Sequence, residues 1–334
     1  MIENNQLSNS TFLKAFSQEF RNFFISVIYV LCVFGIISNI INLKILTHNS
    51  MRTPTNFLLA SLAISDTLLM IAYLPYNVYN HAGALTGSNY HLTIILYILY
   101  ISTLYFHTFS TGTILILAIF RILYILFPVK KNTYCSVARA KLSTVILLIV
   151  SFGIQIPSIL FQCVVKKNEG EEDVYMINVT QEYEQFLMKM HALTGKIIPS
   201  FLLIIFSIII IYLIKRNNLK SRKLHSNNIL IKSSQDVTGS KGPEPTSRES
   251  RGSRTTKILL VIIIFFVTAY LPNGIMLIAN SEVSDAYNIL ADFFDFLQIL
   301  NCTVNFILYC SMSKQFKDAF MSILFKNRCR KIVL

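Results

Sequence analysis

The stretch Asp292-Phe-Phe-Asp-Phe-Leu-Gln-Ile-Leu-Asn-Cys-Thr-Val-Asn-Phe-Ile-Leu-Tyr-Cys-Ser-Met-Ser-Lys-Gln-Phe-Lys-Asp-Ala-Phe320 changes its pattern part of the way along. The first part has no charge between Phe296 and Ser313, so it is apolar enough to cross a bilayer. The second part places Phe316 and Phe320 four residues apart among charged residues, which is typical of an amphipathic helix at a membrane surface. The stretch therefore predicts a spanning helix followed by a short interfacial helix.

Two amide side chains interrupt the apolar part of this stretch. Asn301 and Asn305 are four residues apart and so lie on one face of a helix. Amides in a lipid-solvated helix are costly unless they face protein or water. We therefore expect this face to point into a bundle of helices.

The rest of the chain is equally suited to a membrane. Its 334 residues are 53% hydrophobic, with a mean hydropathy of +0.54, more than a soluble domain needs. Seven apolar stretches have spanning length, at approximately 22–46, 54–78, 92–127, 142–165, 192–214, 257–280 and 287–312. The fold class expected is an all-α membrane protein, a seven-transmembrane-helix bundle with a short interfacial eighth helix.

The segments outside these spans complete the expected organisation. Residues 1–21 are too polar for a cleaved signal peptide, so we expect an extracellular N-terminus and a first span that acts as an uncleaved anchor. Within the seven-helix domain of 22–312, the polar stretch 215–257 has the composition of a disordered intracellular loop. Residues 313–334 hold the interfacial helix and a basic cytoplasmic tail.

The distribution of charge favours a membrane orientation over binding of nucleic acid. The net charge is +13, yet all but six of the 30 Lys and Arg fall on one side of the predicted membrane. This asymmetry predicts that the basic side is cytoplasmic and the N-terminus outside. The glycosylation acceptors Asn9 and Asn178 both lie on the predicted outer side, whereas the match at Asn301 lies inside a span and is discounted.

Several polar residues lie inside the predicted spans. Asp66 is the one acid in the middle of a span, where a carboxylate costs roughly 2.5–3.5 kcal/mol on insertion scales and is functional by default. Asn39 lies in the first span beside small residues, and the plainer interpretation is a small-residue packing face with one amide bonded to a neighbouring helix. Ser110 and Arg121 are eleven residues apart, close to three helical turns, and share a face of the third span.

Together these motifs resemble a known family. Leu117-Ala118-Ile119-Phe120-Arg121 and Asn305-Phe306-Ile307-Leu308-Tyr309 are similar to the third-helix and last-helix motifs of rhodopsin-like (class A) G-protein-coupled receptors. The segments Met51–Asn56, Gly195–Pro199, Leu271–Gly274 and Leu300–Tyr309 resemble one branch more closely, the invertebrate myosuppressin and FMRFamide-like peptide receptors with the related Srw-type serpentine receptors. The resemblance extends over the whole chain.

The resemblance implies roles for particular residues. A polar core that holds a sodium ion is expected from Asn39, Asp66, Ser110, Asn301 and Asn305. Coupling to a heterotrimeric G protein is expected at Arg121 and Tyr309. Ligand-binding candidates are Asp295, Asp292, Tyr270 and His107. The expected partners are an extracellular peptide, the G protein and the lipid bilayer of the plasma membrane, with no cofactor, no other metal and no nucleic acid.

The chain also departs from the family pattern. Phe306 replaces the usual proline of the last helix, Phe120 the acid before Arg121, and Tyr270 a tryptophan of the sixth span. No cysteine lies between Cys32 and Cys135, so the third span lacks the partner of the family's outer disulfide. We therefore expect Cys163 to have no mate and Arg121 to be less restrained than in relatives.

Competing functions are weaker on the residues present. No catalytic motif is recognisable, so we do not expect an enzyme. A retinal opsin is disfavoured because no Lys lies between Ser284 and Met312, and an amine receptor because no acid lies between Tyr90 and Phe120. A transporter is disfavoured because the sequence shows neither internal repeats nor broken helices, apart from single prolines. A receptor for an amidated FMRFamide-like peptide remains, with a chemoreceptor for a small environmental molecule as the alternative.

The outer side carries an excess of acids that suits a cationic ligand. At about 100° per residue, Asp295 lies nearer than Asp292 to the face of Asn305, so Asp295 is expected to point into the cavity and Asp292 to lie near the rim. Capping of the helix start by these acids is the plainer alternative.

Overall fold

The computed structural model describes residues 2–81, 89–169, 172–233, 247–279, 285–312 and 316–322. Within these ranges, seven helices are long and apolar enough to cross a membrane, which confirms the expected fold class. Their spanning segments are Glu19–Leu46, Pro54–Tyr79, Tyr90–Leu126, Lys131–Phe161, Glu182–Asn217, Ile258–Ala279 and Ile289–Ser311.

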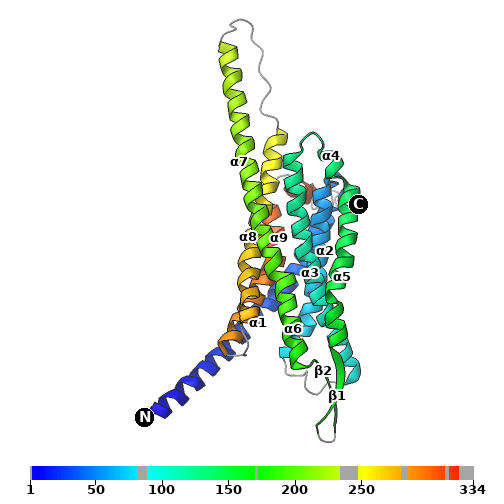
Figure 1. Cartoon of the computed structure of the whole chain (residues 1–334), viewed down its shortest axis with the longest axis vertical. Coiled ribbons are helices and arrows are strands. Elements are labelled where there is room, and N and C mark those ends of the chain that lie inside the picture. Colours follow the sequence, from blue (N-terminus) through cyan, green and yellow to red (C-terminus); the bar gives the residue numbers. More distant parts are fainter. Residues whose placement is uncertain are drawn as a thin grey trace, which may run out of the picture.

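The helices run side by side along one long axis (Figure 1). The elements are α1 (Ile2–Leu46), a short 3-10 turn (Asn49–Met51), α2 (Pro54–His81), α3 (Tyr90–Leu126), α4 (Lys131–Tyr134), α5 (Val137–Phe161), β1 (Cys163–Glu169), β2 (Glu172–Asn178), α6 (Gln181–His191), a π-helical turn (Ala192–Ile197), α7 (Ile198–Ser233), α8 (Ser247–Ala279) and α9 (Asp285–Met312). The β1–β2 hairpin lies at one end of the bundle and α4 at the other (Figure 1). We call these the hairpin end and the α4 end.

The antiparallel hairpin was not expected from the sequence. Its register pairs Cys163 with Asn178, and the described cysteines, Cys163 included, are free. The Thr93 hydroxyl of α3 donates to the Tyr175 carbonyl of β2 at 3.2 Å, and the rings of Tyr90 and Tyr175 meet at 5.4 Å between centroids. These contacts join the hairpin to the start of α3, the place where a disulfide was missing from the sequence.

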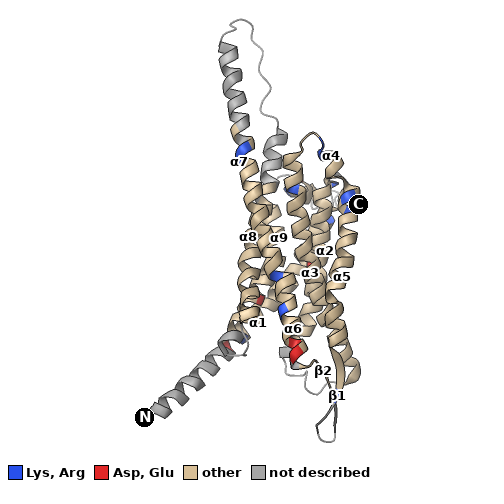
Figure 2. Ribbon diagram, viewed as in Figure 1, with Lys and Arg blue, Asp and Glu red and all other residues tan. Residues whose placement is uncertain are grey.

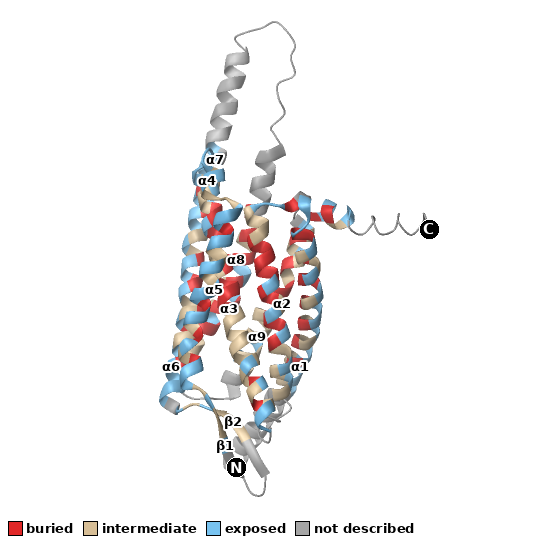
Figure 3. Cartoon of the chain, turned by 90° about the vertical axis from the view of Figure 1, so that its right-hand side faces the viewer, coloured by how far each residue is buried: buried red, intermediate tan, exposed pale blue. Residues whose placement is uncertain are grey.

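A buried core runs through the length of the bundle (Figure 3). Close approach of α1 to its neighbours depends on Gly35, because a Cβ there would lie 2.5 Å from Met70 Sδ on α2 and 2.8 Å from Thr303 Oγ1 on α9. A small residue at such a contact lets two membrane helices pack backbone to backbone. The Gly35–Asn39 segment is therefore a packing face, as its composition predicted.

The polar stretch 215–257 contains more helix than its composition indicated. Helix α7 continues to Ser233 and α8 already begins at Ser247, while residues 234–246 lie outside the described ranges. The first part of the stretch has no Pro or Gly and many Leu, Lys and Arg, which are good helix formers. A helix that is already nucleated inside the membrane extends through such residues at little cost.

A short helix over residues 316–322 follows α9 and lies across the α4 end (Figure 3). Its apolar side faces the bundle as well as the expected membrane surface, because Phe316 is only 1% exposed. Phe306 of α9 meets the rings of Phe316 and Phe320 at 6.2 and 5.8 Å. The residue that replaces the family's proline therefore anchors the eighth helix, and α9 is continuous through it.

Candidate functional site

Asp66 of α2 is the centre of a buried polar cluster, and its side chain is 1% exposed. The Ser110 hydroxyl of α3 donates to Asp66 Oδ1 at 2.6 Å, and the Asn305 amide of α9 donates to Oδ2 at 3.0 Å. One carboxylate thus joins three helices. Of the residues that the sequence grouped here, Asp66, Ser110 and Asn305 meet directly.

Asn39 extends the same cluster to α1. Its Nδ2 donates to the backbone carbonyl of Cys302 at 2.9 Å, and its Oδ1 accepts from Asn42 Nδ2 at 3.3 Å. Both asparagines are fully buried. A buried amide that lost these partners would keep the full cost of its desolvation, so the pairing fixes α1 against α9.

The donor set of the cluster fits a small hard cation. Asn301 Oδ1 and Asn305 Oδ1 are buried acceptor oxygens without a hydrogen-bond donor, and the amide of Asn305 is bonded to the carboxylate of Asp66. Hard cations select oxygen ligands of this kind. Sodium would be held by Asp66, Ser110, Asn301 and Asn305 and would offset the buried negative charge. In the described part of the chain, no group of three His, Cys, Asp or Glu forms a site for another metal ion.

A cavity of about 290 Å³ lies between this cluster and the hairpin end. Three of the four predicted ligand residues line it: His107 of α3, Tyr270 of α8 and Asp295 of α9. The rings of His107 and Tyr270 meet at 5.0 Å, and His107 Nε2 is buried without a partner. Gln298 Nε2 donates to Asp295 Oδ1 at 3.3 Å.

Asp292 is placed differently from Asp295, one turn away on the same helix. It does not line the cavity, and its carboxylate lies 3.5 Å from Arg21 Nε of α1. The side chains of Arg21 and Asp292 are 43% and 19% exposed. Of the two acids considered for ligand contact, only Asp295 is presented to the cavity.

Other cavity residues were not singled out from the sequence. Tyrosines from α2 and α3 face the cavity, and so do His191 and Lys196 from the segment before α7. The residues missed include Tyr73, Tyr76, Tyr100, His191, Lys196 and Gln298. A lysine within an apolar span is itself a functional signal. In the sequence analysis Lys196 appears only within the Gly195–Pro199 segment.

Tyr270 connects the cavity with the polar cluster. Its ring stacks on Phe266 with 4.1 Å between centroids, and its hydroxyl interacts with the side chain of Asn301. It is 3% exposed although it lines the cavity. A ligand that moved this ring would act directly on Asn301.

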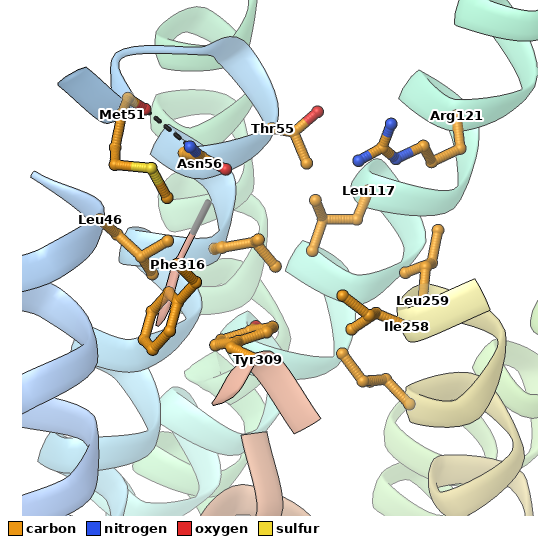
Figure 4. Close-up of a pocket in the computed structure, with 12 residues that line it drawn as sticks. Leu46, Met51, Thr55, Asn56, Leu117, Arg121, Ile258, Leu259, Tyr309 and Phe316 are labelled. Carbon is orange, nitrogen blue, oxygen red and sulfur yellow. Dashed lines mark hydrogen bonds between the residues drawn. The ribbon is translucent and has the colours of Figure 1, made fainter. Parts of the chain in front are cut away.

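A second, smaller cavity of about 40 Å³ lies at the α4 end, and Figure 4 shows its residues. Arg121 is 7% exposed and lines it together with Tyr309, whose hydroxyl is buried without a partner. Most of the other walls are apolar, from Leu46, Leu117 and Ile262 among others. Within the described ranges no acid forms an ion pair with Arg121.

Phe120 and the two glycosylation acceptors complete the predicted set. Phe120 is 7% exposed and belongs to the hydrophobic core, so the residue that replaces the family's acid is a packing residue here. Asn178 ends β2 at the hairpin end and is exposed. The side chain of Asn9 lies outside the described part of the structure.

The fold and these sites define a multi-pass membrane protein with one cavity at each end and a buried polar cluster between them. The family model described as 7 transmembrane receptor (rhodopsin family) matches residues 38–309, and the chain belongs to this family of G-protein-coupled receptors. It is a receptor family rather than a family of enzymes.

Several neuropeptide and hormone receptors are similar to the chain. The FMRFamide receptor of Drosophila melanogaster is 24% identical over 314 residues, which cover 90% of this chain and 53% of that protein. The sex peptide receptor of the same organism is 25% identical, covering 88% and 70%. The thyrotropin-releasing hormone receptor of Bos taurus is 24% identical, covering 91% and 78%. The chain thus spans about half the length of the FMRFamide receptor that it matches.

Proposed function

We propose that the protein is a plasma-membrane receptor for an extracellular amidated peptide of the FMRFamide type, and that it activates a heterotrimeric G protein. The observation that carries this proposal is the cavity in which Asp295 stands among four tyrosines, Tyr73, Tyr76, Tyr100 and Tyr270. A carboxylate and aromatic faces together recognise a cation joined to an aromatic group. A peptide that ends in Arg-Phe-amide carries both.

The size of the cavity supports binding of a peptide end rather than of a whole peptide. About 290 Å³ is near the lower bound of roughly 300 Å³ for ligand pockets. The last residues of an amidated peptide fill such a volume. The rest of the peptide extends out of the cavity at the hairpin end. An amidated end also brings no carboxylate that Asp295 would repel.

The distribution of charge supports an orientation with the hairpin outside. Basic residues gather near α4, and acidic residues gather near the start of α6 at the hairpin end (Figure 2). Positively charged residues favour the cytoplasmic side. In this orientation the exposed Asn178 is outside as a glycosylation acceptor, and the Arg121 cavity opens toward the G protein.

The polar cluster supports transmission between the two ends. Asp66 holds α2, α3 and α9 together through Ser110 and Asn305, and Tyr270 reaches Asn301 from the ligand cavity. Sodium at this cluster stabilises the packing in which Arg121 is enclosed. Agonist binding at the hairpin end weakens that packing, and the α4 end opens.

The test is a calcium or G-protein reporter assay in cells that express the full chain. The panel contains amidated peptides, their free-acid forms, the same peptides with Arg replaced by norleucine, and a set of odorants. We expect activation by Arg-Phe-amide peptides and loss of activation without the Arg. Activation by odorants alone would identify the small-molecule chemoreceptor instead, a function that the modest cavity volume also accommodates.

A further inference from the structure

Lys196 enters the ligand cavity because the helix is locally widened. Pro199 has no N–H, and its ring would clash with the carbonyl of Gly195 four residues earlier in a regular helix. The chain forms a π-helical turn over Ala192–Ile197, immediately before it. Such bulges shift the phase of the side chains. The lysine that precedes the proline lines the cavity.

Gly274 of α8 permits the close approach that this placement requires. A Cβ at Gly274 would lie 2.8 Å from Ile197 Cγ1 and 3.0 Å from Lys196 Cβ. Both atoms belong to the widened turn, so any larger residue at Gly274 would push the turn outward. The Pro272-Asn273-Gly274 segment and the turn are therefore built to fit each other.

Lys196 and Asp295 line the same cavity with opposite charges. They are close enough for their charges to interact, yet their atoms do not approach within the 4.0 Å of a direct ion pair. Two histidines also line the cavity: His107 carries an unpartnered Nε2, and His191 Nε2 lies 2.7 Å from the Ser158 hydroxyl. Among the described residues that line the cavity, Lys196 is thus the one Lys or Arg and Asp295 the one Asp or Glu, and a gap separates them.

We infer that this cavity recognises a ligand end that carries both a cation and a nearby hydrogen-bond acceptor. The cation binds Asp295, and the acceptor binds Lys196. The inference rests on the proposed function and deepens it, because it assigns a partner to the carboxamide oxygen of the amidated peptide. Without ligand, the two charges stabilise each other across the gap. A ligand that offers only a cation would bind Asp295 and leave the Lys196 ammonium without its counter-charge.

This arrangement selects by chemistry as well as by charge. A simple amine lacks the acceptor and a simple acid lacks the cation, so each leaves one half-buried charge of the cavity uncompensated. The peptide Phe-Met-Arg-Phe-amide has a guanidinium one residue before its terminal carboxamide. Ammonium-to-oxygen hydrogen bonds are charge-assisted and among the stronger ones in proteins.

The first arm of the test needs no ligand. The thermal unfolding midpoint of the purified full-length receptor is measured for the wild type, Lys196→Met, Asp295→Asn and the double variant. We expect each single change to lower the midpoint and the double change to restore most of the loss, because it leaves neither charge alone. Lys189→Met is the matched control, since Lys189 is exposed on α6 outside the cavity. Additive effects of the two changes would overturn the pairing.

The second arm uses two peptides, Phe-Met-Arg-Phe-amide and its analogue that ends in phenethylamine and so lacks the carboxamide. For the wild type, we expect the half-maximal concentration of the analogue to be at least about tenfold that of the amidated peptide. This difference is the cost of a lost charge-assisted hydrogen bond. In Lys196→Met the two peptides should be equally potent, whereas in Lys189→Met the preference should persist. Gly274→Ala should weaken the preference, and Gly153→Ala should not, because a Cβ at Gly153 meets nothing within 4 Å.

The outcomes separate this inference from the proposed function. If the amidated peptides activate the wild type but the preference for the carboxamide survives in Lys196→Met, the role of Lys196 is wrong and the peptide receptor stands. If neither peptide activates any variant, the ligand class and the role given to its carboxamide both fail. The thermal unfolding midpoints then test only whether Lys196 and Asp295 stabilise each other.

Discussion

Asp66 and Arg121 are both buried charges in one bundle, yet their surroundings are opposite. Asp66 accepts hydrogen bonds from Ser110 and Asn305, whereas Arg121 lines a largely apolar cavity and forms no ion pair with an acid in the described part of the chain. Burial of a charge without compensation is costly. We propose from this difference that Asp66 serves the bundle itself, while Arg121 is kept for a partner that binds from outside.

The largest effect that follows from this comparison is at Arg121. Arg121→Ala should abolish agonist-stimulated signalling while surface expression is retained, because this guanidinium forms no ion pair with any residue that the structure describes. G-protein activation and cell-surface labelling measure the two parts. Arg139→Ala is the control, since Arg139 is an exposed basic residue at the start of α5 near the same end. Normal signalling by Arg121→Ala would remove the distinction between the two charges.

Asp66→Asn should give the second largest effect. An amide keeps the size of the carboxylate but loses its charge, so it no longer offsets a cation and accepts from only one of the two donors. We expect agonist binding to persist, signalling to fall strongly, and the dependence of binding on sodium to disappear. Radioligand binding with sodium or with N-methylglucamine, beside a G-protein assay, measures this.

A companion variant tests whether an ion or only hydrogen bonding matters at the cluster. Ser110→Ala removes one donor to Asp66 and leaves the charge. It should reduce stability by about 1 kcal/mol and sodium sensitivity only in part. Normal signalling with intact sodium sensitivity in Asp66→Asn would show that the cluster is simply a junction of helices.

These comparisons also show what a sequence does and does not predict. The Asp66 cluster was predictable because its members lie in regular helices, where a spacing of four or eleven residues determines the face, and because the family resemblance grouped them. Lys196 was missed because the π-helical turn before Pro199 changes that phase. Nothing local in the sequence signals that the turn enters the cavity, since the approach depends on Gly274 in a different helix.

Contacts between distant segments set the other differences. The partnership of Asp292 with Arg21 joins α9 to α1 and has no local signature. The hairpin at Cys163–Asn178 is anchored by Thr93 and Tyr175 rather than by a disulfide, and the sequence showed only that the second cysteine was missing. Long-range pairing of this kind is decided by packing, which residue patterns do not encode.

The third prediction compares the two acids of α9. Asp295→Asn should lower the potency of an Arg-Phe-amide peptide by about 10- to 100-fold, the cost of a partly desolvated charge pair. Asp292→Asn should change potency little, because Asp292 is bound to Arg21 outside the cavity, and a partly exposed pair of this kind contributes about 0–1 kcal/mol. Dose–response curves on both variants measure the contrast.

A double-mutant cycle gives this contrast its chemical meaning. Replacing the peptide's Arg by norleucine should erase the difference between the wild type and Asp295→Asn. If the two losses simply add, the carboxylate of Asp295 is structural, and the cation of the ligand binds elsewhere.

The smallest effect is expected at Phe120, beside Arg121. Since no acid in the described ranges pairs with Arg121, we predict basal signalling above that of an empty-vector control. Phe120→Glu should lower it by supplying a carboxylate next to the guanidinium. Phe120 is 7% exposed in the core, however, so the new Glu also costs packing energy and stability. Phe120→Leu separates the two effects, because it reduces packing without adding an acid. Basal G-protein activity per receptor at the cell surface should fall in Phe120→Glu and stay level in Phe120→Leu. An equal fall in both variants would assign the basal activity to core packing. The missing acid before Arg121 would then have no effect on basal signalling.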